Sequence, residues 1–135
     1  MAKKIDELPV FQKAEAFCDA VTAIIDRPGL GKDCKLRDQI SDANDSIPAN
    51  MREGFEQSTD LAFAKYLYYS KGSLGEVLAR LNRAHSKKYI TTEELEPLIA
   101  AGEELGRMLG GFIRYLARSD FKDRGRYNPD KSKGE

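Results

Sequence analysis

The sequence contains no tryptophan, two cysteines and a single histidine among its 135 residues. Because no glutamate lies three positions before His85, the chain lacks the Glu-x-x-His pairs of di-metal helical bundles. Cys18 and Cys34 are too far apart for a zinc-binding pair, and we expect both thiols to be reduced. Nucleophile motifs and glycine-rich phosphate loops are also missing. The sequence therefore predicts no catalytic residue, no metal site and no cofactor.

The chain also lacks net charge, since 22 basic side chains balance 22 acidic ones. A balanced chain does not, as a whole, indicate a nucleic-acid partner. No segment reaches the roughly 18 consecutive apolar residues that a membrane helix requires. The first residues, Met1 to Glu7, are charged and lack the apolar core of a secretory signal. We expect one cytoplasmic domain with no membrane partner.

Apolar residues recur at helical spacing in four segments, which we predict to be helices at about 9–26, 33–55, 60–86 and 93–118. Pro28 and Gly29 separate the first two, and Thr91 with Glu94 forms a capping box before the fourth. Residues 1–8 form a short lead, and residues 119–135 are a polar, flexible tail by their composition. No alternating pattern indicates a strand. The expected fold is all-α, an antiparallel up-down-up-down four-helix bundle.

Polar and small residues interrupt the expected apolar faces of the second and third helices. They are Ser46, Pro48, Asn50, Glu53, Gly54, Gly72, Ser73 and Glu76. Pro48 removes a backbone donor and frees the carbonyl of Asn44, so we expect a kink there. One interpretation is a structural network that joins Asn50 to Ser73 or Glu76 and sets the helix register. The other makes Glu53 and Glu76 metal ligands or a carboxylate pair; the structural interpretation is favoured.

These residues resemble a known family. Ser46-Ile47-Pro48-Ala49-Asn50 with Glu53-Gly54-Phe55 is similar to its S-I-P-x-N-x-x-E-G-x signature. Leu67, Gly72-Ser73-Leu74 and Glu76 are similar to its L-x-x-x-x-G-S-x-x-E element, and the segment 8–14 resembles its opening, with Phe11 at the usual tryptophan position. This is the bacterial four-helix-bundle family first noticed as reading frames inside intervening sequences of 23S ribosomal RNA genes.

The resemblance covers about residues 8–118 and implies an up-down-up-down bundle that assembles into a homopentameric ring. A distant relative is the accessory protein of diversity-generating retroelements, a basic pentamer that binds nucleic acid and reverse transcriptase. Met51-Arg52 departs from the family's small apolar pair, and the chain is neutral rather than basic. The neutral charge weakens the transfer of nucleic-acid binding to this chain.

Charge is distributed unevenly along the sequence. Residues 57–88 carry six basic and two acidic side chains, net +4, whereas residues 89–113 carry one basic and five acidic side chains, net −4. Helical spacing groups Tyr69 with four cations on one side of the third helix, and two arginines follow at the end of the fourth. The candidate nucleic-acid contacts are Lys65, Arg80, Arg83, Lys87, Arg114 and Arg118.

Such charges form either a solvated face, or a phosphate-contacting stripe, or a surface that complements the acidic fourth helix within or between subunits. Gly102, Gly106 and Gly110 repeat every four residues and predict close helix packing, inside the bundle or between subunits. The sequence favours a non-enzymatic homo-oligomer that binds RNA or DNA as part of a ribonucleoprotein. The alternative is a scaffold for an unknown protein partner.

Overall fold

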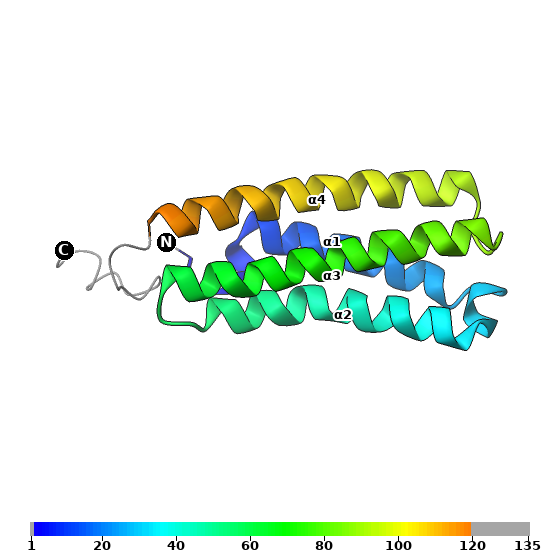
Figure 1. Cartoon of the computed structure of the whole chain (residues 1–135), viewed down its shortest axis with the longest axis horizontal. Helices are drawn as coiled ribbons and strands as arrows, with labels where there is room; N and C mark the ends of the chain where they lie inside the picture. Colours follow the sequence, from blue (N-terminus) through cyan, green and yellow to red (C-terminus); the bar gives the residue numbers. More distant parts are fainter. Residues whose placement is uncertain (1, 120–135) are drawn as a thin grey trace.

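The computed structural model describes residues 2–119, which form an antiparallel bundle of four helices (Figure 1). These are α1 (Pro9–Ile25), α2 (Cys34–Phe55), α3 (Asp60–Ser86) and α4 (Thr92–Arg118), with 3-10 turns η1 (Ile5–Glu7) and η2 (Leu30–Lys32). Each helix packs against its sequence neighbours, and α4 closes the bundle against α1. The all-α, up-down-up-down prediction is confirmed. Most of the expected tail, residues 120–135, lies outside the described residues.

Local capping groups fix where the helices start. Asp33 and Thr59 accept hydrogen bonds from the backbone N–H of Leu36 and Ala62, which satisfies donors at the first turns of α2 and α3. Thr91 and Glu94 form the predicted capping box of α4. Pro97 lies inside α4, on its exposed side, and does not delay the start of the helix.

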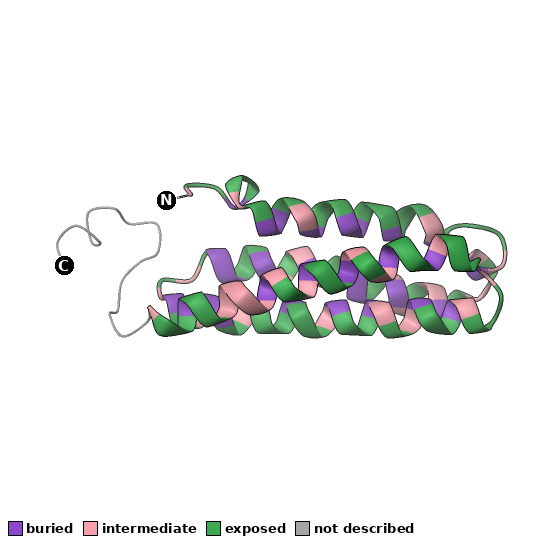
Figure 2. Ribbon diagram, turned by 90° about the horizontal axis from the view of Figure 1, so that it is seen from above, coloured by how far each residue is buried: buried purple, intermediate pink, exposed green. Residues whose placement is uncertain are grey.

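The bundle buries one apolar stripe from each helix (Figure 2). The largest fully buried side chains include Phe11 of α1, Ile47 and Met51 of α2, Phe63 of α3 and Leu105 of α4. Phe11 is fully buried although it lies outside the stripe that helical spacing predicts for the first helix, which is Val10, Ala14, Phe17, Cys18, Val21, Ile24 and Ile25. For α4, helical spacing predicts a buried stripe of Leu95, Ile99, Leu105, Leu109, Phe112, Ile113 and Leu116. Of these, Ile99, Phe112 and Ile113 are only partly buried, whereas Leu98, outside the predicted stripe, is buried. The stripe on α4 is therefore rotated slightly from the one that apolar spacing predicts.

Pro48 lies inside α2 without ending it. The carbonyl of Asn44, which a proline at this position leaves without its helical donor, accepts a hydrogen bond from Cys18 Sγ at 3.4 Å. In return, Asn44 Nδ2 donates to the carbonyl of Cys18 at 3.0 Å. Burial and the nearby Asp19, Asp45 and Glu15 raise the pKa of the Cys18 thiol to about 12, so the sulfur stays protonated at neutral pH and keeps its donor hydrogen.

α3 packs closely against α2 at Gly54, a buried glycine in the last turn of α2. A Cβ atom there would lie 2.7 Å from Phe63 Cδ1 and 2.7 Å from Tyr66 Cβ. Further from the α2–α3 loop, the buried hydroxyl of Ser70 on α3 donates a hydrogen bond to the carbonyl of Ile47 on α2 at 2.8 Å. Together, these contacts fix the rotation of α3 about its own axis and its position along α2.

At one end of the bundle, the loop between α1 and α2 contacts the loop between α3 and α4 through Asp33. Its carboxylate accepts hydrogen bonds from Lys87 Nζ at 2.8 Å and from the Tyr89 hydroxyl at 2.9 Å, in addition to the cap bond from Leu36. These bonds, that of Lys87 first, lower the pKa of Asp33 from its usual 3.8 to about 2. Arg27, in the α1–α2 loop, also pairs with Glu94 of α4. One end of the bundle is therefore closed by polar contacts between its two loops.

The two motif glycines predict opposite effects of alanine. In Gly54→Ala the new methyl group meets Phe63 and the Cβ of Tyr66, so we expect the free energy of unfolding to fall by about 1–3 kcal/mol. In Gly72→Ala no atom lies within 4 Å of the new Cβ. The higher helix propensity of alanine should therefore raise the free energy of unfolding by about 1 kcal/mol. Urea unfolding of both variants measures these changes. A Gly54→Ala protein as stable as the original would contradict the close contact.

The Asp33 cluster predicts a pH dependence. The pKa of Asp33 is lowered on folding, so its charge contributes stability above about pH 3.8, and that contribution is lost as pH falls through about 2. Asp33→Asn keeps a good cap but removes the charge. The stability difference between the two proteins should be largest above pH 4 and shrink toward pH 2, measured by urea unfolding. A difference that is the same at every pH would refute this, and Asp42→Asn, on the exposed side of α2, is the control.

Candidate nucleic-acid interface

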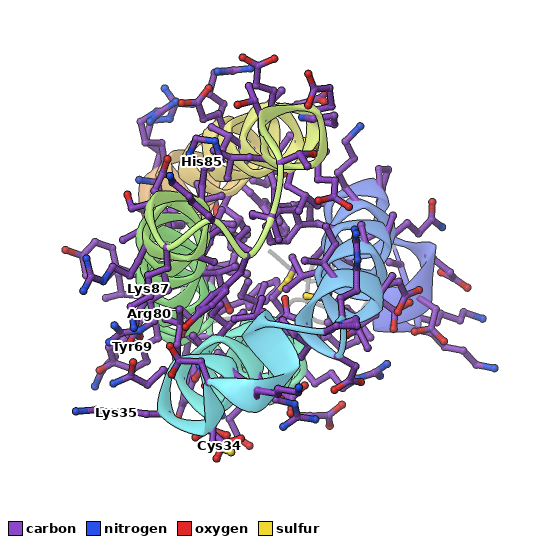
Figure 3. The ribbon with its side chains drawn as sticks, turned by 90° about the vertical axis from the view of Figure 1, so that its right-hand side faces the viewer. Cys34, Lys35, Tyr69, Arg80, His85 and Lys87 are labelled. Atoms are coloured by element: carbon purple, nitrogen blue, oxygen red, sulfur yellow. The ribbon has the colours of Figure 1, made fainter. Side chains whose placement is uncertain are left out.

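The basic side chains predicted on α3 point outward from the bundle. Figure 3 shows Tyr69, Arg80 and Lys87 on the same side of the molecule, with Lys35 of α2 nearby. Lys65 and Arg83 are also exposed, but they lie 18 positions apart, about 27 Å along the helix axis. The predicted stripe therefore runs the length of α3 and is not one compact site.

Of the four cations predicted on the third helix, two are engaged inside the chain: Arg80 of α3 and Lys87, which directly follows α3. Arg80 pairs with Glu76 one turn earlier at 3.1 Å, and Lys87 pairs with Asp33 at 2.8 Å. The ammonium of Lys87 also lies 5.8 Å from the centre of the Tyr89 ring. In residues 2–119 no carboxylate forms an ion pair with Lys65 or Arg83. The end of α3 near the loops is thus partly neutralised, which reduces its attraction for phosphate.

A second basic surface lies between α3 and α4, around the middle of both helices and away from the Asp33 end. A shallow groove of about 660 Å³ is lined by Lys71 of α3 and by Glu103, Gly106, Arg107, Gly110 and Arg114 of α4. Glu103 is the one carboxylate among these lining residues, against three cations. Within the described part of the chain, none of the three cations makes an ion pair. We call this surface the basic groove.

The predicted contacts Arg114 and Arg118 lie in the second half of α4. Arg114 lines the basic groove, and Arg118 is exposed one turn further along. Lys65 lies on the facing part of α3, beside a second hollow between the same helices. The structure therefore separates the six predicted contacts into one group near the loops and another near the basic groove.

Lys71 and Arg107 were not among the predicted contacts, although a signal for them exists. A short turn near residue 89 joins two antiparallel helices, so the numbers of facing residues add to about 180. Leu78 lies against Gly102, Leu74 against Gly106 and Lys71 against Gly110. This counting places Lys71 opposite Arg107 and Gly110 without any structure.

The glycine repeat on α4 has two different surroundings. A Cβ at Gly102 would lie 2.5 Å from Leu78 Cδ2, so this glycine permits close packing inside the bundle. At Gly106 and Gly110 the nearest atoms, of Leu74 and Arg114, would be 3.6 Å and 3.4 Å away. Both glycines line the basic groove, where their lack of side chains leaves room for a ligand or another chain.

The expected hydrogen-bond network between α2 and α3 was wrong in its partners. Asn50 Nδ2 donates to the carbonyl of Ser46 in its own helix at 2.9 Å, and the carboxylate of Glu76 pairs with Arg80. Among the described residues, no hydrogen bond joins Asn50 to Ser73. Polar side chains at the edge of a helix readily reach carbonyl groups one turn earlier, and apolar spacing alone does not reveal this. The bond between Ser70 and Ile47 takes the role expected of Asn50.

The remaining motif residues lie mostly at the surface. Ser46, Pro48 and Ser73 are half-buried, whereas Glu53, Gly72 and Glu76 are exposed. Residues 2–119 contain no group of three or more histidine, cysteine or acidic side chains that could hold a metal ion. No helix in that range combines the length and apolar character needed to cross a membrane.

Comparison with known proteins gives a family and a fold. A solved structure from Bacteroides thetaiotaomicron, described as a protein of unknown function from the S23 ribosomal protein family, matches with a TM-score of 0.70 and 23% identity. The match covers 78% of this chain and 98% of that one. No curated protein matches. The family model of the 23S rRNA-intervening sequence protein matches residues 6–111, and the chain therefore belongs to this family.

Proposed function

We propose that this protein is a non-enzymatic homo-oligomer that binds RNA or DNA by phosphate contacts in the basic groove. The observation that carries the proposal is the cluster of Lys71, Arg107 and Arg114 around Gly106 and Gly110. Arginine and lysine are the side chains that neutralise nucleic-acid phosphates. Because the two glycines carry no side chains of their own, a phosphate backbone can come close to α4 beside Lys71 and Arg114.

The neutral total charge of the chain is compatible with this site. The acidic side chains of α4, such as Glu93 and Glu96, lie in its first half, whereas Arg107, Arg114 and Arg118 lie in its second half. A nucleic-acid strand in the basic groove would therefore meet local positive charge, which a sum over the sequence conceals. The name of the family refers to intervening sequences of 23S rRNA, which agrees with a nucleic-acid setting.

Assembly into a ring, with five subunits as the resemblance implies, is part of the same proposal. A ring needs two different faces that complement one another. No ion pair in residues 2–119 joins α3 to α4, so Arg83 on α3 and the exposed Glu93 and Glu96 on α4 remain available to a neighbouring copy. Opposite charges on different faces favour a head-to-tail contact between copies.

A protein-interaction scaffold without a nucleic-acid role is the alternative. It is supported by Tyr115 of α4, which is 52% exposed and whose ring stacks on that of Phe112. Aromatic side chains of this kind often anchor protein partners. A partner that is captured equally well after nuclease treatment would favour the scaffold.

Light scattering with absorbance at two wavelengths tests assembly and cargo together. We expect untreated protein to form an oligomer of about five subunits, because the basic face of α3 in one copy can bind the acidic face of α4 in the next. Nucleic acid and protein absorb differently at the two wavelengths. A ratio of the two absorbances above the value for pure protein would reveal co-purified nucleic acid. A monomer of 15.1 kDa would refute the assembly proposal.

Charge reversal tests the basic groove. Lys71→Glu with Arg114→Glu should weaken RNA binding by about tenfold or more. The slope of log affinity against log salt should fall by about 0.7 for each phosphate of a single strand that the variant no longer neutralises. The control, Lys35→Glu with Lys88→Glu, makes the same charge change near the Asp33 end of the bundle, at two exposed lysines. Fluorescence anisotropy at several salt concentrations measures both. Equally weakened binding in the two double variants would show a general charge effect and reject the groove as the site.

A further inference from the structure

The basic groove continues into an apolar hollow between the same two helices. This hollow, about 600 Å³, is lined mainly by Leu61, Ala64 and Tyr68 of α3 and by Ile113 and Ala117 of α4. Lys65 is the one charged residue among its lining side chains. The walls of the hollow are mostly apolar and suit an uncharged part of a ligand, whereas the basic groove suits a negatively charged part.

Tyr68 is the most exposed of the large hydrophobic side chains that line the hollow. It is 67% exposed, and Leu61 beside it is 57% exposed. No ring in the described residues packs on Tyr68, whereas the next tyrosine, Tyr69, meets the ring of Tyr66 edge-on at 5.7 Å. The bundle core does not use the Tyr68 ring, and a planar ligand group can reach its face.

The hollow and the basic groove follow one another along the two helices. Tyr68 lies one turn before Lys71 on α3, and Ile113 lies one turn after Gly110 on α4. Residues three positions apart are neighbours on a helix surface, so the two depressions form one furrow. The furrow presents an exposed aromatic ring and apolar walls at one end and three cations at the other.

We infer that this furrow binds a single-stranded stretch of nucleic acid, with a base stacked on Tyr68 and the adjoining phosphates at Lys71, Arg107 and Arg114. The inference rests on the proposed function and specifies its ligand. A single strand offers unstacked bases beside its charges, and base stacking on aromatic side chains is a common mode of single-strand binding. A duplex keeps its base faces inside the stack, so it has nothing to place in the apolar hollow.

The test compares a fluorescent RNA single strand of about 12 nucleotides with a duplex of the same sequence. We expect the single strand to bind more tightly, and Tyr68→Ala to weaken it by about fivefold or more, because the stacked base loses its platform. Tyr68→Phe should retain the affinity, since it keeps the ring. The matched control is Tyr69→Ala, which removes the same side chain from the neighbouring position and should leave binding unchanged.

Two further measurements separate the possible results. Heparin, a polyanion without bases, should bind the original protein and Tyr68→Ala equally. If single strand and duplex bind equally and Tyr68→Ala has no effect on either, the inference is overturned while the groove proposal stands. If the original protein binds neither RNA at about 50 mM salt, the proposed function fails and takes this inference with it. Circular dichroism of Tyr68→Ala confirms that the exposed substitution leaves the helices intact.

Discussion

The contact between α2 and α3 at Gly54 determines much of what lies on the surface. Because Phe63 and the Cβ of Tyr66 occupy the space that a side chain would need, α3 has one rotation against α2. The bond from Ser70 to Ile47 then sets its height. With both fixed, α3 turns Leu74 inward and leaves Tyr68 and Lys71 at its border with α4. The furrow therefore depends on a glycine on a different helix.

Most of the fold could be predicted from the sequence because each helix carries its own signals. Pro28 with Gly29 ends the first helical region, and the Thr91 capping box begins the last helix. These signals act over a few residues and need no knowledge of neighbouring helices. Phe11 and Leu98 were missed because their burial depends on which side of a helix meets the others. That choice is made by packing among four helices and leaves little trace in local spacing.

The candidate site could be predicted only in part, for a related reason. Arg114 and Arg118 were identified from charge alone, but Lys71 and Arg107 become neighbours only when α3 and α4 are paired. The Asn50 network failed because a polar side chain at a helix edge can bond its own backbone. Pro48 contained a better clue. Because Pro48 has no N–H group, the carbonyl of Asn44 needs another hydrogen-bond donor. The neighbouring helix α1 supplies one through the Cys18 thiol.

The separation of charge along α4 also bears on how quickly a ligand would arrive. A molecule with no net charge has little field beyond the Debye length, about 8 Å in physiological salt, so a distant polyanion is not drawn toward it. Close to the surface, the acidic half of α4 repels the same polyanion while the basic half attracts it. Encounter would thus proceed at the modest rate of an unsteered collision. The charges would then act mainly to turn an arriving strand toward one end of the bundle.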